Sequence, residues 1–430
     1  MKCESCAPAF NRRSFLRFSL GAGAGVAAAS LPHSVLAQQT VAKQAAGKSA
    51  RAVILLWMGG GPSHMDIWDP KEPGQKNAGE FKPIATSAPG IKFSEHMVEC
   101  AKAAKHMSII RSMDTKEGAH ERGTSLMHLG IQPVQGLDVP PCGTVISYEK
   151  GKKDFPLPHY IAIDPPLIPQ GNPFPDEYAP FRLNNADNPI PNIHSPAGKD
   201  RDNQRAALLL EQNKEWGSKR QQNEVKKIEA GYVKSEDVMN TPLLKAFNYH
   251  EEKPELRARY GDRFGVNCML ARRLVEAGCS FVEIGMGGWD THNDNFNALK
   301  RMLPTVDKGM GTLIQDLADH SLLNEVMVMW AGEFGRTPDI NAGKGRDHWA
   351  NGFSVVLAGG GLAGGRVYGD TGPNGHGLQK PVPIHNLFAT IYKACGIDCE
   401  KRYETEGRKI KYASVNGNLA SQTKPLMELF

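Results

Sequence analysis

Apolar residues in this chain form short continuous runs that are separated by Gly-rich loops and by longer stretches of helical periodicity. Most runs show little alternation of polar and apolar positions, which is typical of strands buried on both faces of a parallel sheet. The runs predict six strands, over residues 52–58, 107–113, 159–163, 281–286, 325–331 and 353–358.

Between these runs, the helical stretches predict helices over residues 96–105, 123–129, 266–277, 303–321 and 383–395. The last stretch begins at Pro383 and ends next to Gly396, which is the usual asymmetry of helix ends. Alternating strands and helices imply an α/β fold: a doubly wound, mostly parallel sheet with helices on both faces.

Two regions depart from the alternation. Residues 164–200 are dense in Pro and Asn and predict a long loop or lid. Residues 200–260 are rich in Lys, Arg, Glu and Gln, and predict solvated helices. The chain has 430 residues and is 40% hydrophobic, which excludes a disordered or fibrous protein. We expect one large domain over residues 38–430, with a loop-rich and helical insertion at about 164–260.

The N-terminus resembles an export signal. Residues 11–17, NRRSFLR, contain paired arginines followed by a polar residue, Phe-Leu and a base, as in the twin-arginine motif. The apolar run that follows, residues 18–31, is shorter than the ~20 residues of a membrane span. We predict a signal peptide over residues 1–37, cleaved after Ala37. The twin-arginine machinery would then export a periplasmic or secreted protein that has no permanent membrane span.

Removing this segment changes the charge and the cysteine count. The net charge of +5 falls to +2, since the first 37 residues carry four bases and one acid. Such a weak charge gives no reason to expect nucleic acid as a partner. Six cysteines remain, and an oxidising compartment permits disulfides among them. Cys395 and Cys399 are the closest pair in sequence, but the pairing stays open.

Acidic residues and histidines gather just after predicted strands. The segments are GGGPSHMDIWDPK from Gly59, GGWDTHND from Gly287, GEFGRTP from Gly332 and GRDHW from Gly345. In an open α/β sheet, the loops at the carboxyl ends of the strands form the ligand crevice. Carboxylates and imidazoles together suit a divalent metal, for which we consider zinc, manganese and calcium. The candidate ligands are Asp66, Asp290, His292, Glu333, Asp347 and His348.

Four further residues near these segments are candidates for catalysis. His64 and His120 carry imidazoles that suit a general acid or base. Arg336 and Arg346 carry guanidinium groups that bind tetrahedral oxyanions in a bidentate manner. Either arginine is equally well explained as part of a structural ion pair.

The order of the motifs is similar to that of a known family. The export signal, GGGPSHMDIWDPK, GAHERGTSLMHLG, GGWDTHNDNF, GEFGRTP and GRDHW resemble the exported bacterial proteins filed as domain of unknown function 1501. That family is sulfatase-like and resembles the alkaline phosphatase superfamily. The resemblance implies a parallel sheet, one or two metals at its strand ends, and cleavage of sulfate or phosphate esters.

Carried over by residue, this resemblance implies a first metal site at Asp290, His292 and His348. It also implies a sparser second site at Asp66 and Glu333. Residues 118–130 resemble the sulfatase signature, but His120 occupies the place of the Cys or Ser that becomes the nucleophile there. No spacing selects a hydroxyl in its stead, and a metal-generated hydroxide is the alternative.

Two functions therefore remain open. The first is a metal-dependent hydrolase of a sulfated or phosphorylated small molecule or glycan. The second is a non-catalytic exported protein that binds a glycan or a protein partner, with a structural metal or none.

Overall fold

The computed structural model describes most of the chain that follows the predicted signal peptide. The described residues are 49–132, 136–169, 171–184, 186, 190, 193, 198–218, 231, 233–405, 407–412 and 423–430. The predicted signal peptide and its cleavage site lie outside them, so export stays a prediction.

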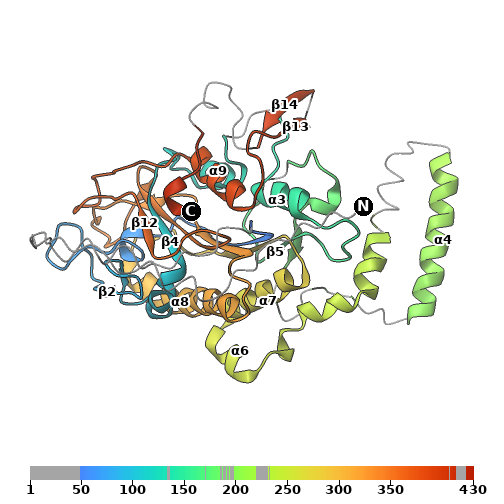
Figure 1. Ribbon diagram of the computed structural model, residues 1–430, viewed down its shortest axis with the longest axis horizontal. Helices are drawn as coiled ribbons and strands as arrows, with labels where there is room; N and C mark the ends of the chain where they lie inside the picture. The colour runs from blue at the N-terminus through green and yellow to red at the C-terminus, as the bar shows by residue number, and fades with distance from the viewer. Residues whose placement is uncertain are drawn as a thin grey trace, which may run out of the picture. The chain divides into compact units, whose positions relative to one another are not determined.

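An eight-stranded sheet forms the centre of the fold (Figure 1). Across the sheet its strands are β12 (Arg366–Tyr368), β4 (Met107–Met113), β11 (Phe353–Gly359), β8 (Val326–Ala331), β1 (Ala52–Met58), β7 (Phe281–Met286), β5 (Tyr160–Ile163) and β6 (Phe181–Leu183). All neighbours pair in parallel except β11, which runs antiparallel to both β4 and β8. The mostly parallel sheet is therefore confirmed, and each of the six predicted strands is present.

Helices cover both faces of the sheet. Ile54 and Leu56 of β1 point into one hydrophobic cluster, whereas Val53 and Leu55 point into another. The first cluster contains side chains of α1 (Val98–Ala103), α7 (Arg263–Ala277) and α8 (Asn295–Asp319). The second contains those of α2 (His120–Leu129), α3 (Cys142–Lys150) and α9 (Ile384–Ala394). Figure 1 shows α3 and α9 on one side of the sheet and α7 and α8 on the other. The doubly wound arrangement is confirmed.

Two helices differ from the prediction. The helix expected from residue 303 begins at Asn295, so Pro304 lies inside α8. Helix α3 was not predicted. It follows Pro140 and Pro141 directly, and it is too short to show a clear period in the sequence.

Between β6 and α7 the described residues are largely helical. The described elements there are α4 (Lys199–Ser218), η5 (Pro242–Phe247), η6 (Tyr249–Glu251) and α6 (Pro254–Tyr260). Before β6, the Pro-rich segment packs against α3 and the start of β5. The ring of Phe174 stacks on Tyr148 at 4.3 Å, and Tyr178 stacks on His159 at 5.0 Å. This part of the predicted lid is therefore anchored by aromatic contacts.

The remaining elements are short. They are β2 (Pro83–Ala85) paired with β3 (Lys92–Ser94), β9 (Gly335–Arg336) with β10 (His348–Trp349), β13 (Arg402–Thr405) with β14 (Arg408–Lys411), and the 3-10 turns η2 (His64–Asp66), η3 (Ala104–His106), η4 (Asp176–Tyr178) and η7 (Met427–Leu429). Among the described residues, no helix combines the length and the apolar character that a membrane span requires. The six cysteines of this part of the chain are all unpaired, Cys395 and Cys399 included.

Candidate metal centre

Five chain segments meet at one edge of the sheet. Strands β1, β4, β7 and β8 run in the same direction, so the loops after them leave from the same edge. Because β11 runs in the opposite direction, the segment before it reaches that edge as well. This segment forms β10, in which His348 pairs with Arg336 of β9.

Three imidazoles surround the carboxylate of Asp290. The Nε2 atom of His292 lies 3.1 Å from Asp290 Oδ1 and 3.0 Å from the Nε2 atom of His348. His348 Nε2 lies 3.2 Å from the same Oδ1 atom. On the other side, His120 Nε2 lies 3.4 Å from Asp290 Oδ2. The ligand atoms of His120, Asp290 and His348 lie within 4.8 Å of one another. We call His120, Asp290, His292 and His348 the acceptor cluster.

The Nδ1 atom of each imidazole faces an oxygen acceptor. His348 Nδ1 lies 2.8 Å from the carbonyl oxygen of Gly118. His292 Nδ1 lies 2.7 Å from Asp347 Oδ1, and His120 Nδ1 lies 2.6 Å from Glu333 Oε1. Because a carbonyl or carboxylate oxygen only accepts, we assign a hydrogen to each Nδ1. In a neutral ring, Nε2 then carries a lone pair that points into the cluster.

This arrangement matches the donor set of a divalent cation. Lone pairs and a carboxylate oxygen 3.0–3.2 Å apart repel one another unless a proton or a cation lies between them. These separations are close to the ~3.3 Å between ligands of a tetrahedral ion with bonds of ~2.0 Å. The Nε2 atom of His120 is buried and has no hydrogen-bond partner. Histidines that bind metals usually donate their second N–H to a carboxylate or a carbonyl, as all three do here.

The protonation states of Asp290 and His348 also suit a cation. Burial opposes ionisation of Asp290, but the hydrogen bond and the charge of Arg336 outweigh it, and the pKa of Asp290 is lowered to about 2. Burial lowers the pKa of His348, which keeps its ring neutral at pH 7. Asp290 therefore supplies a negative charge and His348 a lone pair.

Arg336 lies behind the cluster and is fully buried. Its guanidinium donates to Asp290 Oδ1 at 2.6 Å and to the carbonyl oxygens of Gly60, Gly61 and Arg346. All its nitrogens face protein acceptors, so the group holds the Asp290 carboxylate and is not exposed to a substrate.

Asp66 and Arg346 form a separate buried ion pair. Arg346 donates to the two carboxylate oxygens of Asp66 at 2.8 and 2.9 Å, and Ser63 and Asn295 also donate to this group. The other guanidinium donors of Arg346 bond to backbone carbonyls. The structure therefore does not bring Asp66 or Arg346 into the acceptor cluster.

The remaining polar residues of the glycine-rich segment after β1 are buried inside the fold. Lys71 donates to Asp69 at 2.8 Å, and Arg111 lies 3.1 Å from the same carboxylate. His64 is buried, and neither of its ring nitrogens has a hydrogen-bond partner. Burial lowers its pKa to about 4. His64 is thus a neutral core residue that is not part of the acceptor cluster.

Gly60 of this segment passes close to the cluster. Its φ is +120°, and a Cβ there would lie 2.5 Å from the backbone nitrogen of Asp290. The Gly60 N–H donates to Glu333 Oε1 at 2.9 Å, the atom that also faces His120. The glycine therefore allows the loop to support the residues of the cluster by its backbone.

The structure thus sorts the predicted residues into three groups. It brings His120, Asp290, His292 and His348 together. Glu333 and Asp347 face the outer nitrogens of two imidazoles. It leaves His64, Asp66, Arg336 and Arg346 in buried positions away from solvent. The carbonyl of Gly118 was missed, because a backbone contact leaves no signal in the sequence.

The chain belongs to the family described as protein of unknown function DUF1501, whose family model matches residues 50–422. The family predicted from the motifs is therefore confirmed. A search of curated proteins finds no match.

Several solved structures are similar to this chain. Ps i-CgsB in complex with k-i-k-neocarrahexaose is 11% identical, covers 88% of this chain and 77% of its own, and gives a TM-score of 0.42. PsFucS1 sulfatase from Pseudoalteromonas sp. is 12% identical, with coverage of 81% and 68% and a TM-score of 0.37. Alkaline phosphatase from the Antarctic bacterium TAB5 is 11% identical, with coverage of 81% and 99% and a TM-score of 0.34.

Proposed function

We propose that this protein is an exported, metal-dependent hydrolase of sulfate or phosphate esters. The observation that carries the proposal is the acceptor cluster: three imidazole Nε2 atoms face one ionised carboxylate, and each Nδ1 faces an oxygen. The export signal and the motif order resemble those of sulfatase-like exported proteins, which supports the substrate class. The substrate is then a sulfated or phosphorylated small molecule or glycan.

The proposed metal ligands are His120, Asp290, His292 and His348. Glu333 and Asp347 orient two of the imidazoles and do not bind the ion themselves. Three nitrogens and one carboxylate favour zinc, and manganese is the second choice. Calcium is disfavoured because it takes about six to eight oxygen ligands.

With four protein ligands, the bound ion would need a fifth coordination position to polarise the ester and to lower the pKa of a water molecule to ~7. The ligand side chains are open enough for a substrate to reach, since those of Asp290 and His292 are 48% and 39% exposed. His120 is the first residue of α2, where the helix dipole favours an anionic group.

We propose water as the nucleophile instead of a thiol. Burial raises the pKa of each of the six described cysteines, which keeps their thiols protonated at pH 7. No cysteine belongs to the acceptor cluster in the described part of the chain. Hydrolysis by this route needs no covalent intermediate on the protein.

The experiment is a metal analysis combined with an ester assay. We expect the purified mature protein to contain about one zinc per chain and to hydrolyse an aryl sulfate or an aryl phosphate. A chelator and Asp290→Asn should each abolish turnover, whereas Asp339→Asn, at an exposed carboxylate outside the cluster, should not. Absence of bound metal, or turnover that survives both treatments, would overturn the proposal. One metal per chain with no turnover on any ester would favour the non-catalytic binding protein.

A further inference from the structure

A buried polar trio connects α2 to the central sheet. His128 Nε2 lies 3.0 Å from Glu283 Oε1, and the Tyr160 hydroxyl donates to Glu283 Oε2 at 2.5 Å. His128 Nδ1 faces the carbonyl oxygen of Thr124 at 2.8 Å. None of the four residues of the acceptor cluster takes part in these bonds. Glu283 is the one charged residue of the strand 281–286.

The pair of His128 and Glu283 is ionic. Both ring nitrogens of His128 face oxygens, those of the Thr124 carbonyl and the Glu283 carboxyl group, and this geometry favours a ring that carries both hydrogens. Burial disfavours that charge, but the charge and hydrogen bond of Glu283 outweigh it, and the pKa of His128 is raised. The side chains of His128 and Glu283 are 3% and 0% exposed.

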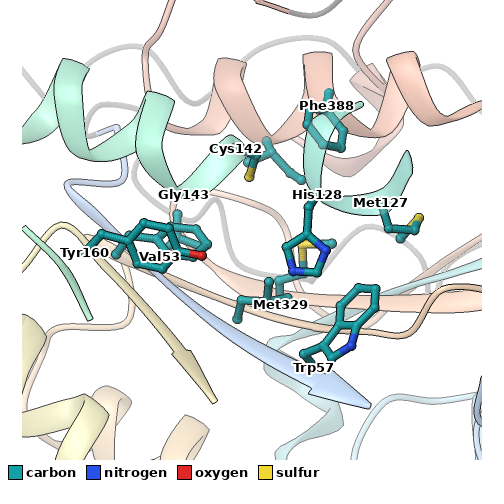
Figure 2. A pocket seen from close by; sticks show the side chains of 12 residues that line it. Val53, Trp57, Met127, His128, Cys142, Gly143, Tyr160, Met329 and Phe388 are labelled. Atoms are coloured by element: carbon teal, nitrogen blue, oxygen red, sulfur yellow. The ribbon is translucent and has the colours of Figure 1, made fainter. Parts of the chain in front are cut away.

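The surroundings of the pair are almost dry. His128 and Tyr160 line a cavity of about 10 Å³ whose other walls are mostly apolar, and the ring of Trp57 lies 4.4 Å from that of His128 (Figure 2). A space of this size holds at most about one water molecule. A buried ion pair rarely stabilises a fold more than apolar residues of the same volume would. We therefore attribute to this ion pair a geometric role: it fixes one orientation of α2 relative to β7.

The two elements that it joins are α2, which carries His120, and β7, which leads to Asp290 and His292. His120 begins α2, and His128 lies eight residues later, which is ~12 Å along the helix axis. Glu283 lies in β7, which leads directly into the loop that presents Asp290. The helix thus meets the loop after β7 at His120 and Asp290, and the strand itself at His128 and Glu283.

We propose that His128 and Glu283 are positioning residues that fix α2, and with it His120, relative to Asp290. Close packing along the helix supports this: a Cβ at Gly123 would lie 3.2 Å from the Cβ of Glu333. This contact holds α2 near His120, and the bond of His128 to Glu283 holds its other end, so we expect loss of that bond to let the helix tilt and move His120. The expected effect on metal affinity rests on the proposed function, whereas the expected effect on the position of α2 does not.

The experiment replaces the whole trio to avoid leaving an unpaired buried charge. The variant H128L/E283M/Y160F keeps the volume apolar and should fold, as circular dichroism can verify. Tyr160→Phe is the matched control, because it removes a hydrogen bond to the same carboxylate without touching α2. His128→Gln is the conservative variant, because its amide can still donate to Glu283. Two readouts are measured: zinc affinity by competition with a chelating dye, and amide hydrogen exchange of α2 in zinc-free protein.

We expect the triple variant to bind zinc about 10- to 100-fold more weakly, the usual effect of removing a group that orients a metal ligand. Its α2 amides should exchange about tenfold faster than wild type, while those of α3 stay unchanged. Tyr160→Phe should change both readouts less than twofold, and His128→Gln should lie between. A folded triple variant with wild-type zinc affinity and wild-type α2 exchange would overturn the inference. Wild-type protein that binds no zinc would refute the proposed function, and α2 exchange would then decide this inference alone.

Discussion

The Nε2 atoms of His292 and His348 lie 3.0 Å apart, although neither ring has a hydrogen there when it is neutral. Both Nδ1 hydrogens are used, one toward Asp347 and the other toward the Gly118 carbonyl. Two lone pairs at this distance, next to the Asp290 carboxylate, destabilise the fold unless a cation lies between them. The close approach of these two Nε2 atoms thus links metal binding to the stability of the fold.

This link predicts how zinc changes the melting temperature. In zinc-free protein, His348→Asn should not lower the melting temperature, because it removes one of the repelling lone pairs. At 100 times the Kd, zinc should stabilise the wild type by about 2.7 kcal/mol and stabilise the variant far less. Differential scanning calorimetry with zinc and with a chelator measures both. A variant that keeps the full zinc-dependent shift would show that His348 is not a ligand.

The outer carboxylates give a second prediction, on affinity. The hydrogen bond from His292 holds the pKa of Asp347 below its ordinary value, so this residue is a charged acceptor for the ring. Asp347→Asn and Glu333→Gln should each weaken zinc binding about 10- to 100-fold and leave one zinc per chain at saturation. Asp339→Asn is the control, since Asp339 bonds to His376 outside the cluster. A stoichiometry that falls to zero for Asp347→Asn would instead make Asp347 a ligand.

The Asp66–Arg346 pair predicts a loss of stability without a loss of zinc binding. Both side chains are fully buried, and removing one charge leaves the other without compensation. Asp66→Asn should therefore cost about 3–5 kcal/mol of unfolding free energy, with zinc stoichiometry and affinity unchanged in the folded fraction. Urea denaturation and a zinc titration of the same sample measure the two effects. A loss of zinc without a loss of stability would restore Asp66 as a metal ligand.

The comparison of Asp66 with Asp290 shows what a sequence can and cannot specify. Both follow a buried strand and a run of glycines, so the pattern correctly predicts that both lie near the same sheet edge. Their roles differ because of residues remote in sequence. Arg346 forms an ion pair with Asp66, whereas His120 and His348 face Asp290. The strands themselves were predictable because burial on both faces leaves continuous apolar runs.

Other features depended on pairing that no local pattern encodes. The run 353–358 predicts a strand but not its antiparallel direction, and it is this direction that brings His348 to the acceptor cluster. Likewise, Glu333 and Asp347 were expected to be ligands because carboxylates bind metals. Only the positions of the imidazoles show that these two carboxylates face the outer nitrogens.

The last prediction concerns pH and His64. Burial lowers the pKa of this residue to about 4, whereas in the unfolded chain it is ~6.5. Between these values the unfolded chain binds a proton that the folded protein does not, so stability falls as pH falls from ~6.5 to ~4. The total contribution is about 3 kcal/mol, since each pH unit corresponds to ~1.4 kcal/mol.

His64→Gln should therefore flatten the acid side of the stability curve, whatever its effect on stability at pH 7. His128 does not contribute to the slope in this range, because its raised pKa keeps it protonated in both states below ~6.5. The measurement is urea unfolding of wild type and variant at intervals from pH 7 to pH 4. His250→Gln, at an exposed histidine, is the control and should keep the wild-type slope. Parallel curves for His64→Gln and wild type would mean that His64 is protonated in the fold, in contact with one of the buried carboxylates near it.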